Sequence, residues 1–409
     1  MPRIISFFLA SFYTIGLLHT AWAQTPEPTI VAETVETISS TTASEPVNSQ
    51  EDPGIATDAK EMVLIDASTN TVLAQKNADV QMFPSSMTKL MTLYVLFERL
   101  KEGSVKLTDN FTVSEKAWRI QGSKMFVPIG AEVQLEDLIR GIHVQSGNDA
   151  CIVVAEGLAG SEDQFAVLMN ETAKKLGMNN THFVNSTGWP DENHYTTARD
   201  LAILGERIIN DFPEYHHYSS EPEFTYNNIR QGNRNLLLSR KDLGVDGLKT
   251  GHTEIAGYGI VLSANEPGGN RRLILVINGL NDIKARADEG AKLLTYGFKQ
   301  FENKTIVKAG DKVLSSPVWL GAQDNVPLAA KEDVVVTLPR AKQLGISMKA
   351  LVNEPVASPV AQGQEVGILE ITLANGEKKS TPLIAAQAVN QKNAFARIPF
   401  VVGHWLGLN

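Results

Sequence analysis

Apolar and polar residues between about 58 and 302 follow two rhythms, one typical of strands and one typical of helices. From Ser85 to about Leu100 the apolar residues recur at helical spacing, and a glycine at 103 predicts where that helix stops. Segment 258–279 has two β-rich runs around a Glu-Pro-Gly-Gly turn, which predicts a hairpin. Further helices are expected at 163–178, 198–212 and 288–301, and a second strand pair at 62–75. This region therefore mixes a sheet with many helices.

The pattern changes after Asn303, where short alternating runs are separated by Gly, Asn and Pro. Runs of this kind predict a small all-β domain, a β-sandwich, over 303–391. The domain contains no cluster of catalytic residue types, so a spacer or a partner-binding role is expected for it.

The last segment, 392–409, has the pattern of an amphipathic tail. Its apolar residues fall on roughly one helical face: Phe395, Ile398, Val401, Val402, Trp405 and Leu408. A tryptophan suits a membrane interface, which favours a membrane anchor of the peripheral kind. Pro399, two glycines and the scarcity of basic residues favour the alternative, a strand or helix packed on the β domain.

The first 57 residues contain no expected part of the folded domains. Residues 1–23 combine Arg3, an apolar run and Ala21-Trp22-Ala23, which is the pattern of a secretory signal peptide cleaved after Ala23. An uncleaved anchor helix is the alternative, disfavoured because the apolar run is short and interrupted. Residues 24–57 are rich in Thr, Ser, Glu, Pro and Ala, and we expect a flexible leader there. The mature protein should be exported.

Composition excludes several classes of function. A net charge of -9 argues against a nucleic-acid partner, which usually requires a basic surface. The one cysteine, Cys151, precludes an internal disulfide, and its apolar neighbours in the sequence predict a buried, unreactive thiol. The histidines lack metal-ligand spacing with acidic partners, so we expect neither a metal nor a cofactor.

The stretch FPSSMTKLMT, residues 83–92, brings candidate chemistry to the helix expected from Ser85. Ser86 and Lys89 are three residues apart, which puts both side chains on one helical face. Free N–H groups at a helix start, with the positive end of the dipole, favour an oxyanion. Lysine removes the proton of a serine only when its pKa is lowered, by burial or by a second cation nearby, so the pair predicts another positive residue further along the chain. Helix capping by either serine is the alternative.

Two later motifs supply what the first one lacks. Ser-Gly-Asn at 146–148 precedes an apolar helix-like run, where capping is again the alternative interpretation. Lys-Thr-Gly at 249–251 precedes a strand, and Gly251 would let a substrate backbone approach closely. Lys249 would be the expected second cation. The order Ser-x-x-Lys, Ser-x-Asn, Lys-Thr-Gly is the motif set of penicillin-binding proteins and class A β-lactamases.

With these motifs the chain resembles the low-molecular-mass penicillin-binding proteins, the serine-type D-alanyl-D-alanine carboxypeptidases, over most of its length. The segments QSGNDAC, TARDLAILG and VDGLKTGHTEIAGY carry the resemblance, as do the β-rich second domain and the tail. It implies an α/β (α+β) penicillin-binding/β-lactamase-like transpeptidase domain over 58–302, with an antiparallel sheet and helices on both sides. It also implies a periplasmic enzyme, peripheral on the outer face of the inner membrane.

The resemblance implies removal of the terminal D-alanine from peptidoglycan stem pentapeptides, and acylation by β-lactams. Lys89 would take the proton of Ser86, which then attacks the penultimate carbonyl. Ser146 would relay the proton to the leaving amine, and Asn148 would hold the substrate amide and orient the lysine. The backbone N–H groups of Ser86 and His252 would form the oxyanion hole, worth about 3 kcal/mol for each donor.

Substrate binding is also carried over from the resemblance. Lys249, Thr250 and Arg286 would bind the terminal carboxylate, beside Gly251. One departure stands out, because Thr187 precedes Gly188 where the best-known members have a histidine.

Other functions compete with the carboxypeptidase. A class A β-lactamase would need a glutamate between the second and third motifs, and Glu221 and Glu223 are the candidates there. An endopeptidase that cuts cross-bridges would use the same groups on another substrate. A non-catalytic wall-binding protein with a decayed site is disfavoured by the intact motifs.

Overall fold

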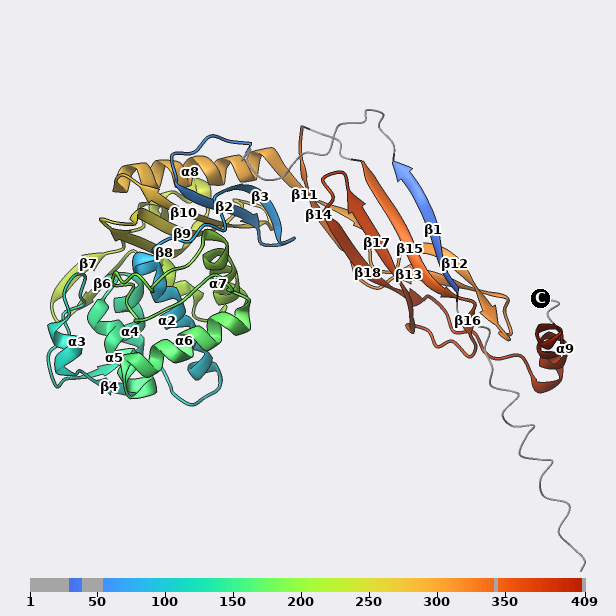
Figure 1. Ribbon diagram of the computed structural model, residues 1–409, viewed down its shortest axis with the longest axis horizontal. Helices are drawn as coiled ribbons and strands as arrows, with labels where there is room; N and C mark the ends of the chain where they lie inside the picture. The colour runs from blue at the N-terminus through green and yellow to red at the C-terminus, as the bar shows by residue number, and fades with distance from the viewer. Residues whose placement is uncertain (1–28, 39–53, 342–344, 407–409) are drawn as a thin grey trace, which may run out of the picture. The chain divides into compact units, whose positions relative to one another are not determined.

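The computed structural model describes residues 29–38, 54–341 and 345–406, which form two compact units (Figure 1). Of these residues, one unit comprises 54–303 with 339–341, and the other comprises 29–38, 304–338 and 345–406. The expected signal segment 1–23 lies outside the described residues. Because the positions of the units relative to each other are not determined, each is described by itself.

The first unit is built on a five-stranded antiparallel sheet with the strand order β3-β2-β10-β9-β8. Its strands are β2 (Glu61–Asp66), β3 (Thr71–Lys76), β8 (Val245–Thr253), β9 (Gly257–Asn265) and β10 (Arg272–Leu280). The hairpins expected at 62–75 and 258–279 are confirmed as β2-β3 and β9-β10. The expected combination of an antiparallel sheet with helices is confirmed as well.

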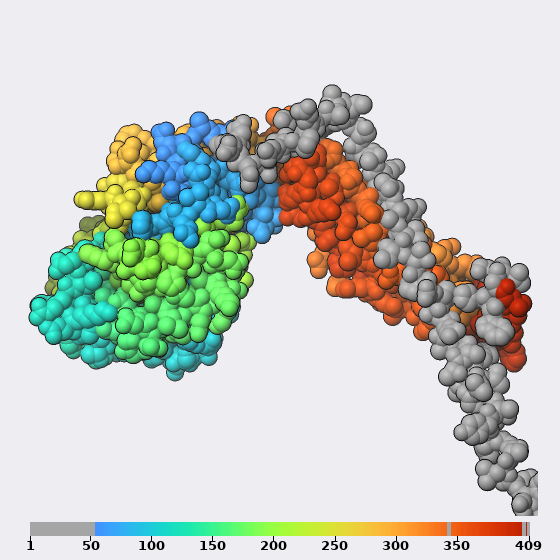
Figure 2. All heavy atoms as spheres, in the orientation of Figure 1, coloured from blue at the N-terminus to red at the C-terminus, as the bar shows by residue number. Residues whose placement is uncertain are grey.

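The central strand β10 reads as a continuous apolar run because both faces of the sheet are covered. Ile274 and Val276 belong to the core on one face, together with residues of α2 and α7 (Ala198–Asp211). Leu275 and Ile277 belong to the core on the other face, with residues of α8 (Ile283–Gln300). This alternation is the period of two expected for a strand. In the space-filling view the first strands of the unit, drawn in blue, lie against its last helix, α8, drawn in gold (Figure 2).

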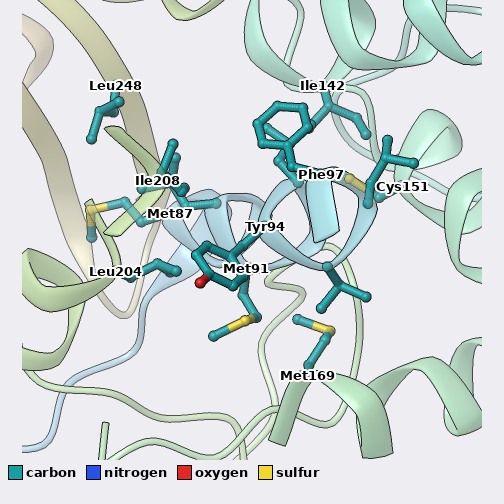
Figure 3. Packing of buried hydrophobic residues seen from close by; sticks show 14 of the residues in the cluster. Met87, Met91, Tyr94, Phe97, Ile142, Cys151, Met169, Leu204, Ile208 and Leu248 are labelled. Atoms are coloured by element: carbon teal, nitrogen blue, oxygen red, sulfur yellow. The ribbon is translucent and has the colours of Figure 1, made fainter. Parts of the chain in front are cut away.

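Helix α2 (Lys89–Lys101) lies at the centre of the unit, and its residues from Lys89 to Phe97 are all buried. Side chains from α7, β8, α4 (Leu135–His143), α5 (Asn148–Ala159) and α6 (Glu162–Leu176) pack around it. Figure 3 shows this for Phe97 against Ile142 and Cys151. The helix expected from Ser85 is thus present, and from Lys89 to Phe97 other elements cover it on every side. Such a position holds a polar group only where it is hydrogen-bonded, and Lys89 occupies one.

The remaining helices and short strands of this unit surround α2 and the sheet. They are η1 (Ser85–Thr88), β4 (Asn110–Thr112), α3 (Glu115–Arg119), β5 (Glu132–Gln134), α4 (Leu135–His143), α5 (Asn148–Ala159), α6 (Glu162–Leu176), η2 (His216–Ser220), β6 (Glu223–Tyr226), β7 (Ile229–Gly232), η3 (Leu236–Ser239) and η4 (Lys241–Leu243). The helices expected at 163–178 and 198–212 are confirmed as α6 and α7. Helix α8 begins at Ile283, earlier than the sequence indicated, because Asp282 caps it by accepting a hydrogen bond from the N–H of Ala285.

The second unit is a β domain, as expected. A seven-stranded sheet has the order β1-β15-β17-β18-β13-β12-β16, and β11 pairs with β14. Its strands are β11 (Phe301–Val307), β12 (Lys312–Trp319), β13 (Asn325–Ala330), β14 (Val334–Pro339), β15 (Ile346–Glu354), β16 (Val356–Ala357), β17 (Glu365–Leu373) and β18 (Lys378–Ala385). Alternate residues such as Leu369, Ile371 and Leu383 are fully buried and form one apolar core.

The leader departs from the expectation that all of 24–57 is flexible. Residues Thr29–Ile38 form strand β1, which pairs antiparallel with β15, from Thr29 opposite Glu354 to Val35 opposite Met348. The segment is rich in β-branched residues, and the edge of a sheet offers unpaired N–H and C=O groups to such a strand. Local composition alone did not indicate this partner, which is distant in the sequence. Residues 39–53 lie outside the described part.

The tail forms helix α9 (Ala394–Trp405), with Pro399 inside it. Its apolar side chains are exposed: 85% of Phe395, 45% of Ile398 and 49% of Val402. These three side chains therefore do not pack on the β domain, which was the alternative for this segment. The side chain of Trp405 and all of Leu408 lie outside the described residues. Among the described helices, none is long and apolar enough to cross a membrane.

Candidate active site

Ser86 lies in the 3-10 turn η1, which leads directly into the buried helix α2. Pro84 begins the turn, and its carbonyl accepts a hydrogen bond from the N–H of Met87. Lys89 is the first residue of α2, and its Nζ donates a hydrogen bond of 2.9 Å to Ser86 Oγ. The side chain of Ser86 is half-buried, whereas that of Lys89 is fully buried. The first motif thus forms the contact that its spacing predicted.

Three acceptors surround the ammonium group of Lys89. Besides Ser86 Oγ, its Nζ donates to Asn148 Oδ1 at 2.8 Å and to the carbonyl of Thr187 at 2.5 Å. Neither the amide oxygen nor the backbone carbonyl can donate a hydrogen bond. If the amine is neutral, its two N–H groups are held by these two acceptors, and its lone pair points to the Ser86 hydroxyl. The geometry therefore orients a base.

Burial lowers the pKa of Lys89 to about 8, and Arg234 is the strongest cationic contribution in the same direction. Cys151, Asp149 and Glu162 act in the opposite direction. The sequence pointed to Lys249 as the cation that suppresses this basicity. The pKa of Lys249 is itself well lowered, first by burial and then by Lys89. Desolvation is thus the main cause for both amines.

The second motif faces the first from the start of α5. Asn148 is the first residue of α5, and its Nδ2 donates to the carbonyl of Gln121 at 2.8 Å while its Oδ1 holds Lys89. Ser146 is buried and has a positive φ of 57°, a conformation that costs about 1–2 kcal/mol for a non-glycine residue. Lys249 Nζ donates to Ser146 Oγ at 3.0 Å. The second and third motifs are therefore in direct contact.

The third motif lies on β8, against the turn that carries Ser86. A Cβ added to Gly251 would lie 3.1 Å from the carbonyl oxygen of Pro84 and 3.1 Å from Met87 Cγ. Glycine therefore allows this strand to approach η1 closely. The next residue, His252, stacks its ring on Tyr258 at 3.8 Å between centroids. His252 lines the same cleft as Ser86.

A cleft of about 400 Å³ brings most of the expected site residues together. Its lining comprises Ser86, Ser123, Ser146, Arg234, Leu236, Thr250, Gly251, His252, Tyr258, Ile283 and Arg286. Lys89, Asn148 and Lys249 lie behind this lining and reach it through the hydrogen bonds to Ser86 and Ser146. All nine residues expected from the sequence are thus in one place.

Arg234 is a cleft residue that the sequence did not single out. Its Nη1 donates to Ser123 Oγ at 2.7 Å, and its carbonyl accepts from Arg286 Nη2 at 3.0 Å. Burial lowers the pKa of Arg286 to about 10, and its guanidinium lies over the Tyr258 ring at 5.8 Å. Arg234 stands between short irregular segments, where no periodicity marks a residue. With Lys249, the two arginines give the cleft a cationic end that suits a carboxylate.

Other candidates lie outside the cleft lining. Cys151 is buried, and burial raises the pKa of its thiol to about 12, which fits an unreactive side chain. Glu221 pairs with Arg140 at 3.0 Å, and Glu223 pairs with Arg230. Neither glutamate lines the cleft, so neither is placed to activate a water as a class A β-lactamase requires.

The turn at 185–189 closes over the start of α2. Asn185 Oδ1 accepts hydrogen bonds from the N–H groups of Thr187, Gly188 and Trp189. The Thr187 hydroxyl donates to Asn185 Oδ1 and accepts from the N–H of Trp189. This hydroxyl thus both donates and accepts a hydrogen bond within the turn. Thr187 contacts Lys89 through its backbone carbonyl and not through its side chain.

Replacing Gly188 by alanine should destabilise the protein by about 3 kcal/mol or more. Gly188 has φ +81°, and an added Cβ would lie 1.8 Å from the Ser85 carbonyl oxygen. Gly177→Ala is the matched control, because Gly177 has φ +82° and no atom within 4 Å of an added Cβ. Chemical denaturation should show a loss of only about 1–2 kcal/mol for the control. Equal losses in the two variants would contradict the close contact.

Comparisons with known proteins agree with this arrangement. The D-alanyl-D-alanine carboxypeptidase family profile matches residues 45–281, and that of the C-terminal domain of penicillin-binding protein 5 matches 301–391. D-alanyl-D-alanine carboxypeptidase DacA from Escherichia coli K12 is 40% identical over 367 residues, covering 87% of this chain and 91% of that one. DacC from the same strain is 41% identical over 348 residues, covering 83% and 86%.

A solved structure extends the similarity to the fold. Penicillin-binding protein 5 from Haemophilus influenzae matches with a TM-score of 0.74 and 38% identity, over 82% of this chain and 99% of that one. The matches span both the cleft-bearing unit and the β domain. The chain therefore belongs to the serine-type D-alanyl-D-alanine carboxypeptidases, a family of low-molecular-mass penicillin-binding proteins.

Proposed function

We propose that this protein removes the terminal D-alanine from peptidoglycan stem pentapeptides through an acyl-enzyme on Ser86, and that penicillin acylates the same serine. One observation carries the proposal. Ser86, Lys89, Asn148, Ser146 and Lys249 are joined by hydrogen bonds into two short chains at one cleft. A serine with a buried amine as its base is the arrangement that an acyl transfer needs.

Acylation begins with the neutral form of Lys89, which accepts the Ser86 proton as Ser86 Oγ bonds to the penultimate carbonyl carbon. The carbonyl oxygen becomes an oxyanion beside the N–H groups of Ser86 and His252. Collapse of this intermediate breaks the C–N bond to the terminal D-alanine. Ser146, in contact with Lys249, delivers a proton to the departing amine.

Substrate binding in this scheme uses the cationic end of the cleft. Thr250, Arg286 and Lys249 hold the terminal carboxylate, and Arg234 adds a fourth group that the sequence did not indicate. Asn148 orients Lys89 through its Oδ1, while its Nδ2 donates to the carbonyl of Gln121. Water then attacks the acyl carbon, the ester bond to oxygen breaks, and the serine regains its proton. The product is a peptide shortened by one D-alanine.

Acylation by penicillin should become faster as the pH rises toward 8. The reacting form of Lys89 is the neutral amine, and its pKa is lowered to about 8 by burial. Below that pH the neutral fraction, and with it the second-order rate constant, should rise about tenfold for each pH unit. Labelling with a fluorescent penicillin between pH 5.5 and 8, as a time course at each pH, measures this slope. A rate that is flat or falls across this range would contradict a neutral Lys89 as the base.

The site of action follows from the two ends of the chain. The pattern of residues 1–23 supports export to the periplasm, and the exposed apolar side chains of α9 support a peripheral contact with the outer face of the inner membrane. Flotation with anionic vesicles tests the second part. The intact protein should float, and a protein ending at residue 391 should not.

Assay of D-alanine release separates the carboxypeptidase from its alternatives. Monomeric pentapeptide should lose one D-alanine per chain, and purified cross-linked dimer should be cut more slowly. Preferential cleavage of the dimer would favour the endopeptidase. Rapid turnover of penicillin without D-alanine release would favour the β-lactamase, and a folded protein with no activity in either assay would refute the proposal.

A further inference from the structure

A buried carboxylate outside the cleft holds the turn at 185–189, and no step of the mechanism above uses it. Glu162 is the first residue of α6 and is only 8% exposed. Its Oε1 accepts hydrogen bonds from the Ser186 N–H at 3.0 Å and from Ser186 Oγ at 2.7 Å. Its Oε2 pairs with Lys116 at 2.9 Å. Both carboxylate oxygens are therefore used.

Ser186 is fixed from the opposite side as well. Its carbonyl accepts a hydrogen bond of 2.6 Å from Thr92 Oγ1, which belongs to the buried helix α2. Glu162 thus holds the amide and hydroxyl side of Ser186, while α2 holds its carbonyl. The next carbonyl along the chain is that of Thr187, which accepts from Lys89 Nζ. The Thr187 carbonyl lies in the next planar peptide unit, whose N–H, that of Gly188, donates to Asn185 Oδ1 at 2.8 Å. The N–H of the first unit, that of Thr187, donates to the same oxygen, so fixing Ser186 also restricts where the Thr187 carbonyl can lie.

The position of the Thr187 carbonyl matters because a neutral amine has only two N–H groups. One is held by Asn148 and the other by Thr187, and this leaves the lone pair of Lys89 facing Ser86. Without the Thr187 acceptor the amine can rotate, and its lone pair no longer faces the hydroxyl. A displacement of about 1 Å in a reacting group can cost about 100-fold in rate.

The side chain of Thr187 cannot set this position by itself, since its hydroxyl is engaged within the turn by Asn185 and Trp189. The internal hydrogen bonds shape the turn, whereas Glu162 ties it to α6. A carboxylate suits the task because one of its oxygens can accept two hydrogen bonds at once. The half-exposed Lys116 offsets the cost of its burial.

We propose that Glu162 is a positioning residue for the general base: by holding Ser186 it keeps the Thr187 carbonyl where it orients Lys89. This inference rests on the proposed role of Lys89. Glu162 does not touch the cleft, so it acts through the turn and not on the substrate. Its effect should therefore fall on the chemical step of acylation and not on binding.

Three variants test the inference in the full-length protein. Glu162→Ala removes the acceptor of both Ser186 hydrogen bonds. Glu162→Gln keeps an acceptor oxygen for them and loses the charge. Lys116→Met removes the ion pair and leaves the contact with Ser186 in place. For each, the rate of acylation by a fluorescent penicillin is measured against its concentration, so that the limiting rate constant and the half-saturating concentration are obtained separately.

Glu162→Ala should lower the limiting acylation rate constant by about 10- to 100-fold and change the half-saturating concentration less than about threefold. Glu162→Gln should recover most of the rate, and Lys116→Met should stay within about threefold of wild type. A folded Glu162→Ala protein with the wild-type limiting rate would overturn the inference. So would a loss in Lys116→Met as large as that in Glu162→Ala, because the ion pair would then be the cause.

Should Glu162→Ala fail to fold, Ser186→Ala decides, since it removes one of the two hydrogen bonds and keeps the backbone one. A limiting rate about 3- to 10-fold below wild type supports the inference, and an unchanged rate overturns it. The wild-type protein separates this result from the proposed function. If the wild-type protein is labelled on Ser86 and the variants have the wild-type limiting rate, only the inference fails. A wild-type protein that is not labelled refutes the proposed function itself.

Discussion

Replacing Ser86 by alanine should abolish both penicillin labelling and D-alanine release, with a loss of at least about 10⁴-fold. The hydroxyl of Ser86 is the one that Lys89 reaches, at 2.9 Å, and it lines the cleft. Alanine fits the half-buried position without a clash, so the variant should keep the wild-type thermal transition. Gel fluorescence after a long incubation with labelled penicillin measures the residual reaction.

The neighbouring serine provides the matched control. Ser85 Oγ faces Thr253 Oγ1 at 3.3 Å and does not line the cleft. Ser85→Ala should therefore be labelled within about tenfold of the wild-type rate, because serine and alanine both carry the Cβ that makes its φ of +50° unfavourable. Full labelling of Ser86→Ala together with loss in Ser85→Ala would mean that the nucleophile was assigned to the wrong serine.

Replacing Lys89 by methionine should lower the acylation rate by about 10³- to 10⁴-fold. Methionine has nearly the same length and fits the buried position, but it offers no lone pair of comparable basicity to the Ser86 hydroxyl. The rising limb of the rate against pH should disappear together with the amine. Time courses of labelling at pH 6 and pH 8 measure both effects.

Lys101 serves as the control because it lies in the last turn of the same helix. Its Nζ donates to the carbonyl of Asp211, at the protein surface. Lys101→Met should react at the wild-type rate with the same dependence on pH. If Lys89→Met kept the rising limb, another group would be the titrating base.

The elements that could be predicted from the sequence are those with a clear apolar pattern and a local start or stop signal. The β9-β10 hairpin follows from two β-rich runs around turn residues. Helix α6 follows from its apolar spacing and from Gly177, which takes the left-handed conformation that ends the helix. Strand β1 was not anticipated, because its partner β15 lies more than 300 residues away and no local pattern indicates it.

The candidate site divides in the same way. Side chains within short motifs, such as Ser86 with Lys89, could be predicted because three residues along a helix fix their proximity. The carbonyl of Thr187 could not, since every residue has one and only the fold brings it to Lys89. Arg234 with Ser123, and Glu162 with Ser186, are likewise contacts that only the fold brings about. Of the two causes that the sequence allowed for a lowered pKa of Lys89, burial is the larger, and the cation that adds to it is Arg234 and not Lys249.

The most direct test of the central claim is the site of the covalent adduct. The intact protein is treated with benzylpenicillin at pH 8, weighed by mass spectrometry, and then digested so that the modified peptide can be sequenced. The account predicts one penicilloyl group per chain, carried by Ser86. An adduct on any other residue, or a folded protein that gains no mass, would contradict it.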